Sequence, residues 1–145
     1  MSTAAPAFKV DDARVVAAIV AAEQRTSGEI RVLVSRQKID EPLPAAQKHF
    51  ERLGMTKTGA RNGVLIFISP AAKTFAVIGD QGVHKKCGEV FWAGVAGAMT
   101  ECFKRGEFTA GLVLGIERAG ALLAEHFPRS PDDRNEQPDA VERTD

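Results

Sequence analysis

The sequence of 145 residues has no excess of either charge, since 19 lysine and arginine residues balance 19 aspartate and glutamate residues. Proteins that bind nucleic acid usually carry a basic excess, so this balance and the lack of a recognition motif argue against a nucleic-acid partner. No apolar run approaches the roughly 18 to 20 residues that a membrane span needs. With 44% hydrophobic and 26% charged residues, the composition is that of an ordinary globular domain.

Cysteine is scarce, and the familiar catalytic motifs are missing. Cys87 and Cys102 lie fifteen positions apart, which matches neither a CxxC motif nor a zinc pattern, so we expect two free thiols. Neither has the arginine six positions later that a Cys-x5-Arg phosphatase loop requires. HExxH, GxSxG, P-loop and dinucleotide-binding motifs are also absent. The catalytic residues of any enzyme activity are therefore unknown from the sequence.

The apolar stretch VVAAIVAA, residues 15–22, raises the question of a signal peptide. Asp11 and Asp12 stand where a signal peptide would be positively charged, and no convincing small-residue cleavage site follows. The same stretch has the spacing of a helix. We therefore expect a folded helix and a cytoplasmic protein.

Hydrophobic periodicity predicts an α/β fold with a small mixed sheet and about four main helices. Strand–helix–strand order makes the first two strands parallel, and a four-residue turn makes the third antiparallel to the second. The expected helices span residues 11–25, 44–53, 89–105 and 108–127, and the expected strands span residues 29–35, 64–69 and 74–79.

The predicted domain spans residues 10–128. Residues 1–9 are expected to form a flexible arm of alanine, proline, serine and threonine. Residues 129–145 carry six acidic residues against three arginines and few hydrophobic residues, which predicts a disordered acidic tail.

Polar side chains gather where the predicted topology brings three segments to one edge of the sheet. The starts of the first two strands and the end of the third carry two carboxylates, an amide and hydroxyls, which are the oxygen ligands that Ca²⁺ and Mg²⁺ prefer. Arginine can hold a phosphate or carboxylate through two hydrogen bonds. The candidate metal ligands are Glu29 and Asp80, expected to face one another, and the candidate residues for substrate binding or for the loop site are Arg61, Asn62, Ser27, Gln81 and His84.

A simpler interpretation of these residues is a set of turns. Glycine and aspartate both favour turns, and Arg61 can serve only to neutralise Glu29 or Asp80. His84 is a ligand or proton carrier in one interpretation and a solvated turn residue in the other. The usual ligand crevice of parallel strands also lies at the opposite end. The spacing of the residues leaves both interpretations open.

Taken in order, several short motifs resemble the TPM domain family over about residues 10–140. The motifs are TSGE (26–29), RNG (61–63), GDQG (79–82), FTAGL (108–112) and HFP (126–128). The family includes a thylakoid-lumen protein of plants, a photosystem-associated protein, worm receptor-auxiliary proteins and many bacterial proteins. The resemblance implies a three-layer α/β/α sandwich, an acidic site for a divalent cation at the sheet edge, and a phosphatase activity proposed for some members. Many bacterial members resemble secreted or anchored proteins with a signal peptide, a C-terminal span and a glycine-rich tail, and this sequence shows none of the three.

Two functions are compatible with this sequence. The first is a divalent-cation-binding regulatory or interaction module, in which Ca²⁺ or Mg²⁺ orders the three loops and an unknown protein partner docks nearby. The alternative is a metal-assisted acid phosphatase that acts on phosphate monoesters of a phosphorylated small molecule. Glu29 and Asp80 would hold the cation there, Arg61 the phosphate, and a metal-bound water would attack. The missing nucleophile and general base favour the module.

Overall fold

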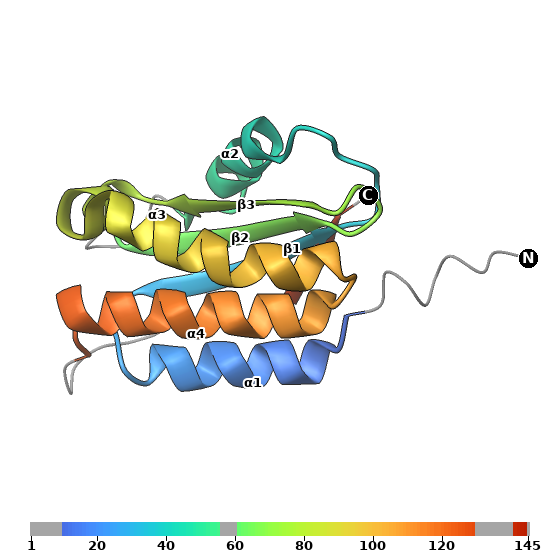
Figure 1. Ribbon diagram of the computed structural model, residues 1–145. Coiled ribbons are helices and arrows are strands. Elements are labelled where there is room, and N and C mark those ends of the chain that lie inside the picture. The colour runs from blue at the N-terminus through green and yellow to red at the C-terminus, as the bar shows by residue number, and fades with distance from the viewer. Residues whose placement is uncertain (1–9, 56–60, 130–140, 145) are drawn as a thin grey trace, which may run out of the picture.

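A computed structural model describes residues 10–55, 61–129 and 141–144 of the chain (Figure 1). Helices and strands alternate along most of the sequence. Their bounds are α1 (Asp12–Glu23), β1 (Glu29–Ser35), α2 (Pro42–Arg52), β2 (Gly63–Ser69), β3 (Thr74–Gly79), α3 (Gln81–Lys104), α4 (Phe108–His126) and β4 (Val141–Thr144).

The strands form one mixed sheet in the order β3-β2-β1-β4. β1 and β2 run parallel, with Glu29 opposite Gly63. β2 and β3 run antiparallel, with Val64 opposite Gly79. The predicted α/β fold and both strand pairings are thereby confirmed, and the ends that carry the polar motifs lie at the same edge of the sheet.

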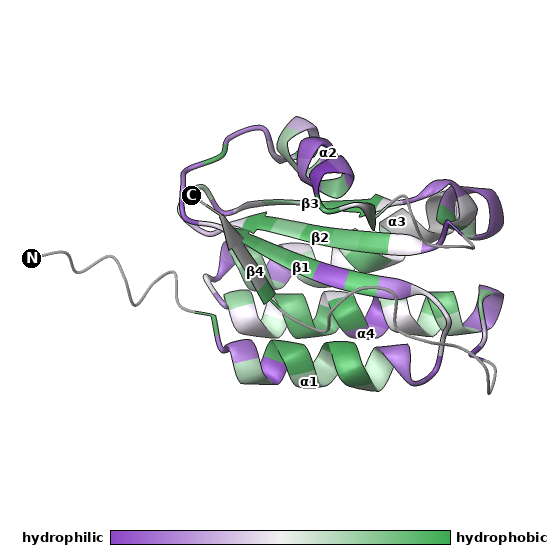
Figure 2. Cartoon of the chain, turned by 180° about the vertical axis from the view of Figure 1, so that it is seen from behind, coloured by the Kyte–Doolittle hydropathy of each residue, from purple (hydrophilic) through white to green (hydrophobic). Residues whose placement is uncertain are grey.

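Helices cover both faces of this sheet, which confirms the three-layer α/β/α sandwich (Figures 1 and 2). α1, α3 and α4 cover one face, and α2 covers the other. Successive side chains of a strand point to opposite faces, so Ile30 and Val32 pack towards the three helices while Leu33 packs towards α2. Both faces of β1 and β2 are buried, as the nearly continuous apolar sequence of β2 indicates.

Three glycines of α4 allow its neighbours to approach closely. A Cβ atom at Gly111 would lie 2.4 Å from a ring carbon of Phe103, and one at Gly115 would lie 2.5 Å from the sulfur of Met99, both in α3. A Cβ atom at Gly120 would lie 2.7 Å from that of Ala22 in α1. These glycines therefore set the spacing of the three-helix layer.

β4 corrects the prediction for the C-terminal tail. Val141–Thr144 pair in parallel with the last four residues of β1, and Val141 packs against the core beneath α1, α3 and α4. The expectation of disorder is wrong for these four residues, because the exposed edge of β1 supplies the backbone hydrogen-bonding partners that a short polar segment cannot supply itself. Residues 130–140 and 145, like the arm at 1–9, lie outside the described residues.

α3 begins eight residues earlier than predicted. It consists of two helical segments that meet at Gly88, whose φ of 64° and ψ of −158° are not helical. The sequence analysis recognised the second segment and predicted no helix for the first, residues 81–87. The helix instead starts directly after β3, because Asp80 caps it: the Asp80 carboxylate accepts a hydrogen bond from the backbone N–H of Gln81.

Two further predictions concern the cysteines and the membrane. Both thiols are free: Cys102 is buried and Cys87 is half-buried at the end of the first α3 segment. None of the helices in the described part of the chain is long and apolar enough to cross a membrane.

Candidate functional site

The centre of the site is an ion pair between Arg61 and Asp80. Nε of Arg61 donates to Oδ2 of Asp80 at 2.6 Å, and Nη2 donates to Oδ1 at 2.7 Å. The Asp80 side chain is 4% exposed, whereas the Arg61 side chain is 38% exposed. The hydrogen bond to Asp80 raises the pKa of Arg61 above its ordinary value. The structure thus pairs the two candidates that the sequence analysis placed on neighbouring strands.

The backbone holds these two residues in place independently of their side chains. The N–H of Asp80 donates to the carbonyl of Gly63 at 2.9 Å, and the N–H of Gly82 donates to the carbonyl of Arg61 at 2.8 Å. Arg61 has a φ of 53°, a left-handed conformation that is uncommon for residues other than glycine. Strained conformations of this kind cluster at functional sites.

A cleft of about 640 Å³ opens beside the ion pair, between α2 and the start of α3. This volume is in the range of small-molecule sites. Four predicted residues line it, namely Arg61, Asp80, Gln81 and His84. The end of β3 adds Ile78 and Gly79 to the lining. The sequence analysis missed the wall that comes from α2, which consists of Gln47, Phe50 and Glu51.

Spacing within α2 is the signal that could have identified this wall. Residues 47, 50 and 51 stand three and four positions apart and share one side of a helix. Phe50 is 5% exposed and packs in the core beneath α2. Gln47 and Glu51 were not considered as site residues, because nothing local in the sequence says which loop α2 faces.

Ser27 and Asn62 form a separate pair outside the cleft. The amide nitrogen of Asn62 donates to the hydroxyl of Ser27 at 3.2 Å, and Asn62 is 2% exposed. Gly28 lies against Leu123 of α4 and the Asn62 carbonyl, so this pair belongs to the packing of the loops on α4. Neither residue is among the residues that line the cleft in the described structure.

Glu29 lies in the same row of the sheet as Asp80, with Gly63 between them. Glu29 pairs with Gly63 on one side, and Asp80 bonds to Gly63 on the other. Met55 covers this glycine: a Cβ atom there would lie 3.3 Å from the Met55 carbonyl oxygen and 3.4 Å from its methyl carbon. Glu29 is 2% exposed and is not among the described residues of the cleft wall. Its role as a metal ligand stays a prediction.

Few oxygen donors surround Asp80. No group of three or more histidine, cysteine, aspartate or glutamate side chains that could hold a metal ion occurs among the described residues. Mg²⁺ commonly binds through only one or two carboxylates and keeps waters or phosphate oxygens as its other ligands. Asp80 offers one buried carboxylate, and Glu51 with the amides of Gln47 and Gln81 offers further oxygen atoms in the same cleft.

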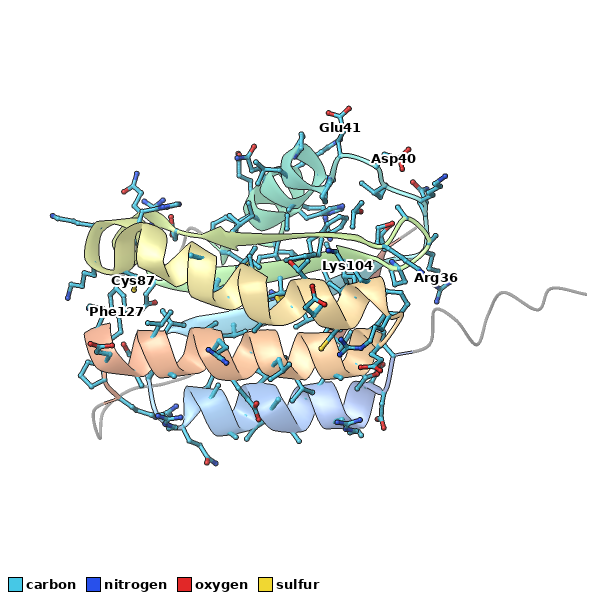
Figure 3. The ribbon with its side chains drawn as sticks, viewed as in Figure 1. Arg36, Asp40, Glu41, Cys87, Lys104 and Phe127 are labelled. Atoms are coloured by element: carbon cyan, nitrogen blue, oxygen red, sulfur yellow. The ribbon has the colours of Figure 1, made fainter. Side chains whose placement is uncertain are left out.

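The TSGE and HFP motifs meet beside this sheet edge. The hydroxyl of Thr26 and the N–H of Ser27 both donate to the carbonyl of Phe127, and the N–H of Gly28 donates to the Thr26 hydroxyl. The Lys86 amine lies 4.9 Å from the centre of the Phe127 ring. Figure 3 shows Phe127 and Cys87 at the same end of the molecule. These motifs therefore join the loop before β1, the end of α4 and the first segment of α3.

Comparison with known proteins agrees with this architecture. The chain resembles the BA42 protein from the psychrophilic bacterium Bizionia argentinensis, with 38% identity, 92% of each chain covered and a TM-score of 0.86. It also resembles the N-terminal domain of the cg2496 protein from Corynebacterium glutamicum, with 15% identity, 81% of this chain and 74% of that chain covered, and a TM-score of 0.60, which shows the fold alone. No curated protein matches the sequence. The profile of the TPM domain matches residues 7–122, and the chain therefore belongs to the TPM domain family.

Proposed function

We propose that the protein is a divalent-cation-binding regulatory or interaction module, with the cation held at Asp80 in the cleft beside α2. The observation that carries the proposal is the Asp80 carboxylate itself, which is nearly buried, fixed in orientation and placed at a ligand-sized cleft. Ca²⁺ and Mg²⁺ prefer such oxygen ligands. A cation there would join the loop at Arg61, the cap of α3 and the face of α2, which are the parts a protein partner or a phosphorylated small molecule would contact.

Thermal melts with and without millimolar Ca²⁺ or Mg²⁺ test this proposal. A ligand that binds only the folded state raises the melting temperature, so wild type should melt higher with the cation. Asp80→Asn keeps the size of the side chain and removes its charge, so the cation shift should vanish. Glu29→Gln and Glu51→Gln show which second carboxylate binds the cation, because the shift in melting temperature should decrease in that variant. A full shift in Asp80→Asn, or no shift in wild type, would exclude this site.

The alternative function is a metal-assisted acid phosphatase acting on phosphate monoesters. The observation in its favour is that Arg61, suited to phosphate, and His84, a possible proton carrier, line the same cleft. When bound, the cation would supply an activated water. Arg61 would orient the phosphate. Hydrolysis of p-nitrophenyl phosphate by the melting-assay samples distinguishes the two: the phosphatase requires cation-dependent turnover that is lost in Asp80→Asn and reduced in Arg61→Gln.

A further inference from the structure

The outer face of the three-helix layer is largely apolar. α4 lies in the middle of this layer, between α1 and α3 (Figure 1). A surface helix normally carries charged and polar side chains on its exposed side. The exposed or half-buried row of α4 instead consists of Ala110, Leu114, Glu117, Ala121 and Ala124. α1 adds the exposed Ala17 and Ala21, and α3 adds Gly94, Gly97 and Ala98. An apolar area of this kind marks an interaction surface.

Two neighbouring opposite charges, Glu117 and Arg118, stand in the middle of the outer face. Both are exposed, and neither forms an ion pair within the described part of the chain. Successive residues of a helix are turned by about 100°, so the two side chains lie on opposite sides of the row that joins Leu114 to Ala121. Glu117 lies on the α1 side, where it lines a hollow of about 170 Å³ together with Ala18, Ala21, Ala22, Arg25 and Gly120. Arg118 therefore lies on the α3 side.

Contacts within the layer show which residues of its three helices stand level with one another. Gly120 of α4 lies against Ala22 of α1, and Gly115 lies against Met99 of α3. Other contacts show that α1 runs parallel to α4 and that α3 runs antiparallel to it. All three helices rise by about 1.5 Å per residue, so residues 115–120 of α4 are level with 17–22 of α1 and with 94–99 of α3. The small residues of α1 and α3 therefore stand at the height of Glu117 and Arg118.

From this arrangement we propose that the outer face binds a second copy of this chain, around a two-fold axis that runs along α4. Each α4 then packs in parallel against the partner's α4, and each α1 packs against the partner's α3. Glu117 of one copy faces Arg118 of the other, and symmetry repeats the contact. The partner's Arg118 reaches the hollow that Glu117 lines. The alanines of α1 meet the glycines of the partner's α3 at the same height, so the helices can approach closely.

The charges distinguish this axis from the other two-fold arrangement of the same face. An axis across the helices would pack the two α4 helices antiparallel and place Glu117 on the same side as its own copy, which is unfavourable. The axis along α4 instead brings unlike charges together in the middle of the face. It also sets Arg14 of α1 level with Glu101 of the partner's α3 at the rim, where both are exposed. The balanced net charge of the chain adds no repulsion between copies.

The size of the face predicts a reversible dimer. The row from Ala110 to Ala124 is about 20 Å long, and three helices side by side are about 25 to 30 Å wide. The flat area is then about 500 to 600 Å² per copy, somewhat below the roughly 800 Å² of a standard interface. Dimer and monomer should therefore exchange, and the protein concentration should decide which of them prevails.

Sedimentation velocity over a range of protein concentrations tests the proposal. The mass of wild type should rise with concentration towards that of a dimer. Glu117→Arg and Arg118→Glu each place like charges opposite one another, so each should weaken the dimer about tenfold or more. An equal mixture of the two variants should dimerise about as well as wild type, because the arginines of one chain face the glutamates of the other. Lys48→Glu, an exposed change of the same charge on α2, is the control and should leave the dimer unchanged.

Ala121→Glu provides a test that does not depend on the existing charges. It sets two carboxylates against each other where the α4 helices meet, and glutamate is a good helix former, so the chain should fold and the dimer should weaken. Circular dichroism checks the folding of every variant. None of these residues lines the cleft in the described structure, so the result is independent of cation binding.

Three outcomes would overturn the proposal. The first is a wild type that stays monomeric up to millimolar concentration. The second is equal dimerisation of wild type, both charge variants and Ala121→Glu, which would place any dimer on another surface. The third is a mixture of Glu117→Arg and Arg118→Glu that dimerises no better than either variant alone, which would exclude the two-fold axis along α4.

Discussion

Replacing Gly111 with alanine tests how closely α3 and α4 are packed. The new Cβ atom would lie 2.4 Å and 2.7 Å from two ring carbons of Phe103. That ring is 2% exposed and is held between Phe75 and Phe108, with ring centres 5.0 Å and 5.9 Å away. Phe103 therefore has no space to move into, and the helices must separate.

Two opposing effects determine how far Gly111→Ala changes the free energy of unfolding. Alanine stabilises a helix interior by about 0.5 to 1 kcal/mol relative to glycine, and overpacking a core costs about 1 to 3 kcal/mol. We expect Gly111→Ala to lower the free energy of unfolding by up to about 2 kcal/mol. Gly97→Ala in α3 is the matched control, because no atom lies within 4 Å of its Cβ position. Gly97→Ala should raise the free energy of unfolding by the gain in helix propensity alone, about 0.5 to 1 kcal/mol.

Urea titration and thermal melting of the two variants measure the difference. For a chain of this size, 1 kcal/mol corresponds to a shift in melting temperature of about 2 to 4 °C, so the two variants should move in opposite directions. Gly115→Ala should lie between them, because the atom it meets is the flexible Met99 thioether. If Gly111→Ala were as stable as Gly97→Ala, the close contact of α4 with Phe103 would be refuted.

Three further predictions follow from other contacts. Deleting residues 130–145 should lower the melting temperature, because the edge of β1 loses its partner strand and Val141 leaves the core; an unchanged melt would show that β4 adds no stability. Thr26→Val should lower the free energy of unfolding by about 1 to 3 kcal/mol in urea, because the buried N–H of Gly28 loses its acceptor and the Phe127 carbonyl loses one of its two donors. Thr26→Ser should retain most of the stability, and similar losses in both variants would exclude the hydroxyl as the cause. Burial and the neighbouring basic side chains of α2 lower the pKa of His49 from 6.5. Below pH 6.5 the unfolded chain therefore binds a proton before the folded chain does, so the free energy of unfolding should be highest above pH 6.5 and decrease below it. His49→Gln should flatten this pH dependence in urea titrations from pH 5 to 8, and an unchanged slope would assign it to other groups.

The sheet and most of the helices could be predicted because their signals are local. The alternation in residues 29–35 and the continuous apolar run in β2 each identify a strand without reference to the rest of the chain. β4 and the first segment of α3 have no such signal. β4 depends on the free edge of β1, a partner more than a hundred residues earlier. The first α3 segment depends on the Asp80 cap and ends at Gly88, just before the helix that the sequence predicted.

The candidate site was predictable to the extent that strand register determines it. Arg61 precedes Gly63 by two residues, and Asp80 bonds to Gly63 where β2 and β3 pair, so the antiparallel register brings Arg61 and Asp80 together. For the wall formed by α2, the helical spacing predicts which residues share one side of the helix, but no local signal in the sequence indicates that this side faces the cleft. Glu29 lies in the same row of the sheet as Asp80, across Gly63, which Met55 covers, and its part in the site stays a prediction.

The break in α3 at Gly88 divides one helix into two segments. The backbone of Gly88 lies in a region accessible essentially only to glycine. A Cβ atom at this position would meet no neighbouring atom, so the backbone conformation, and not a lack of space, requires glycine. The first segment, residues 81–87, contributes Gln81 and His84 to the cleft, while the second contains Met99 and Phe103, which lie against glycines of α4. A residue with non-helical backbone separates the two segments, so the side chains that line the cleft and those that pack against α4 are positioned by separate lengths of helix.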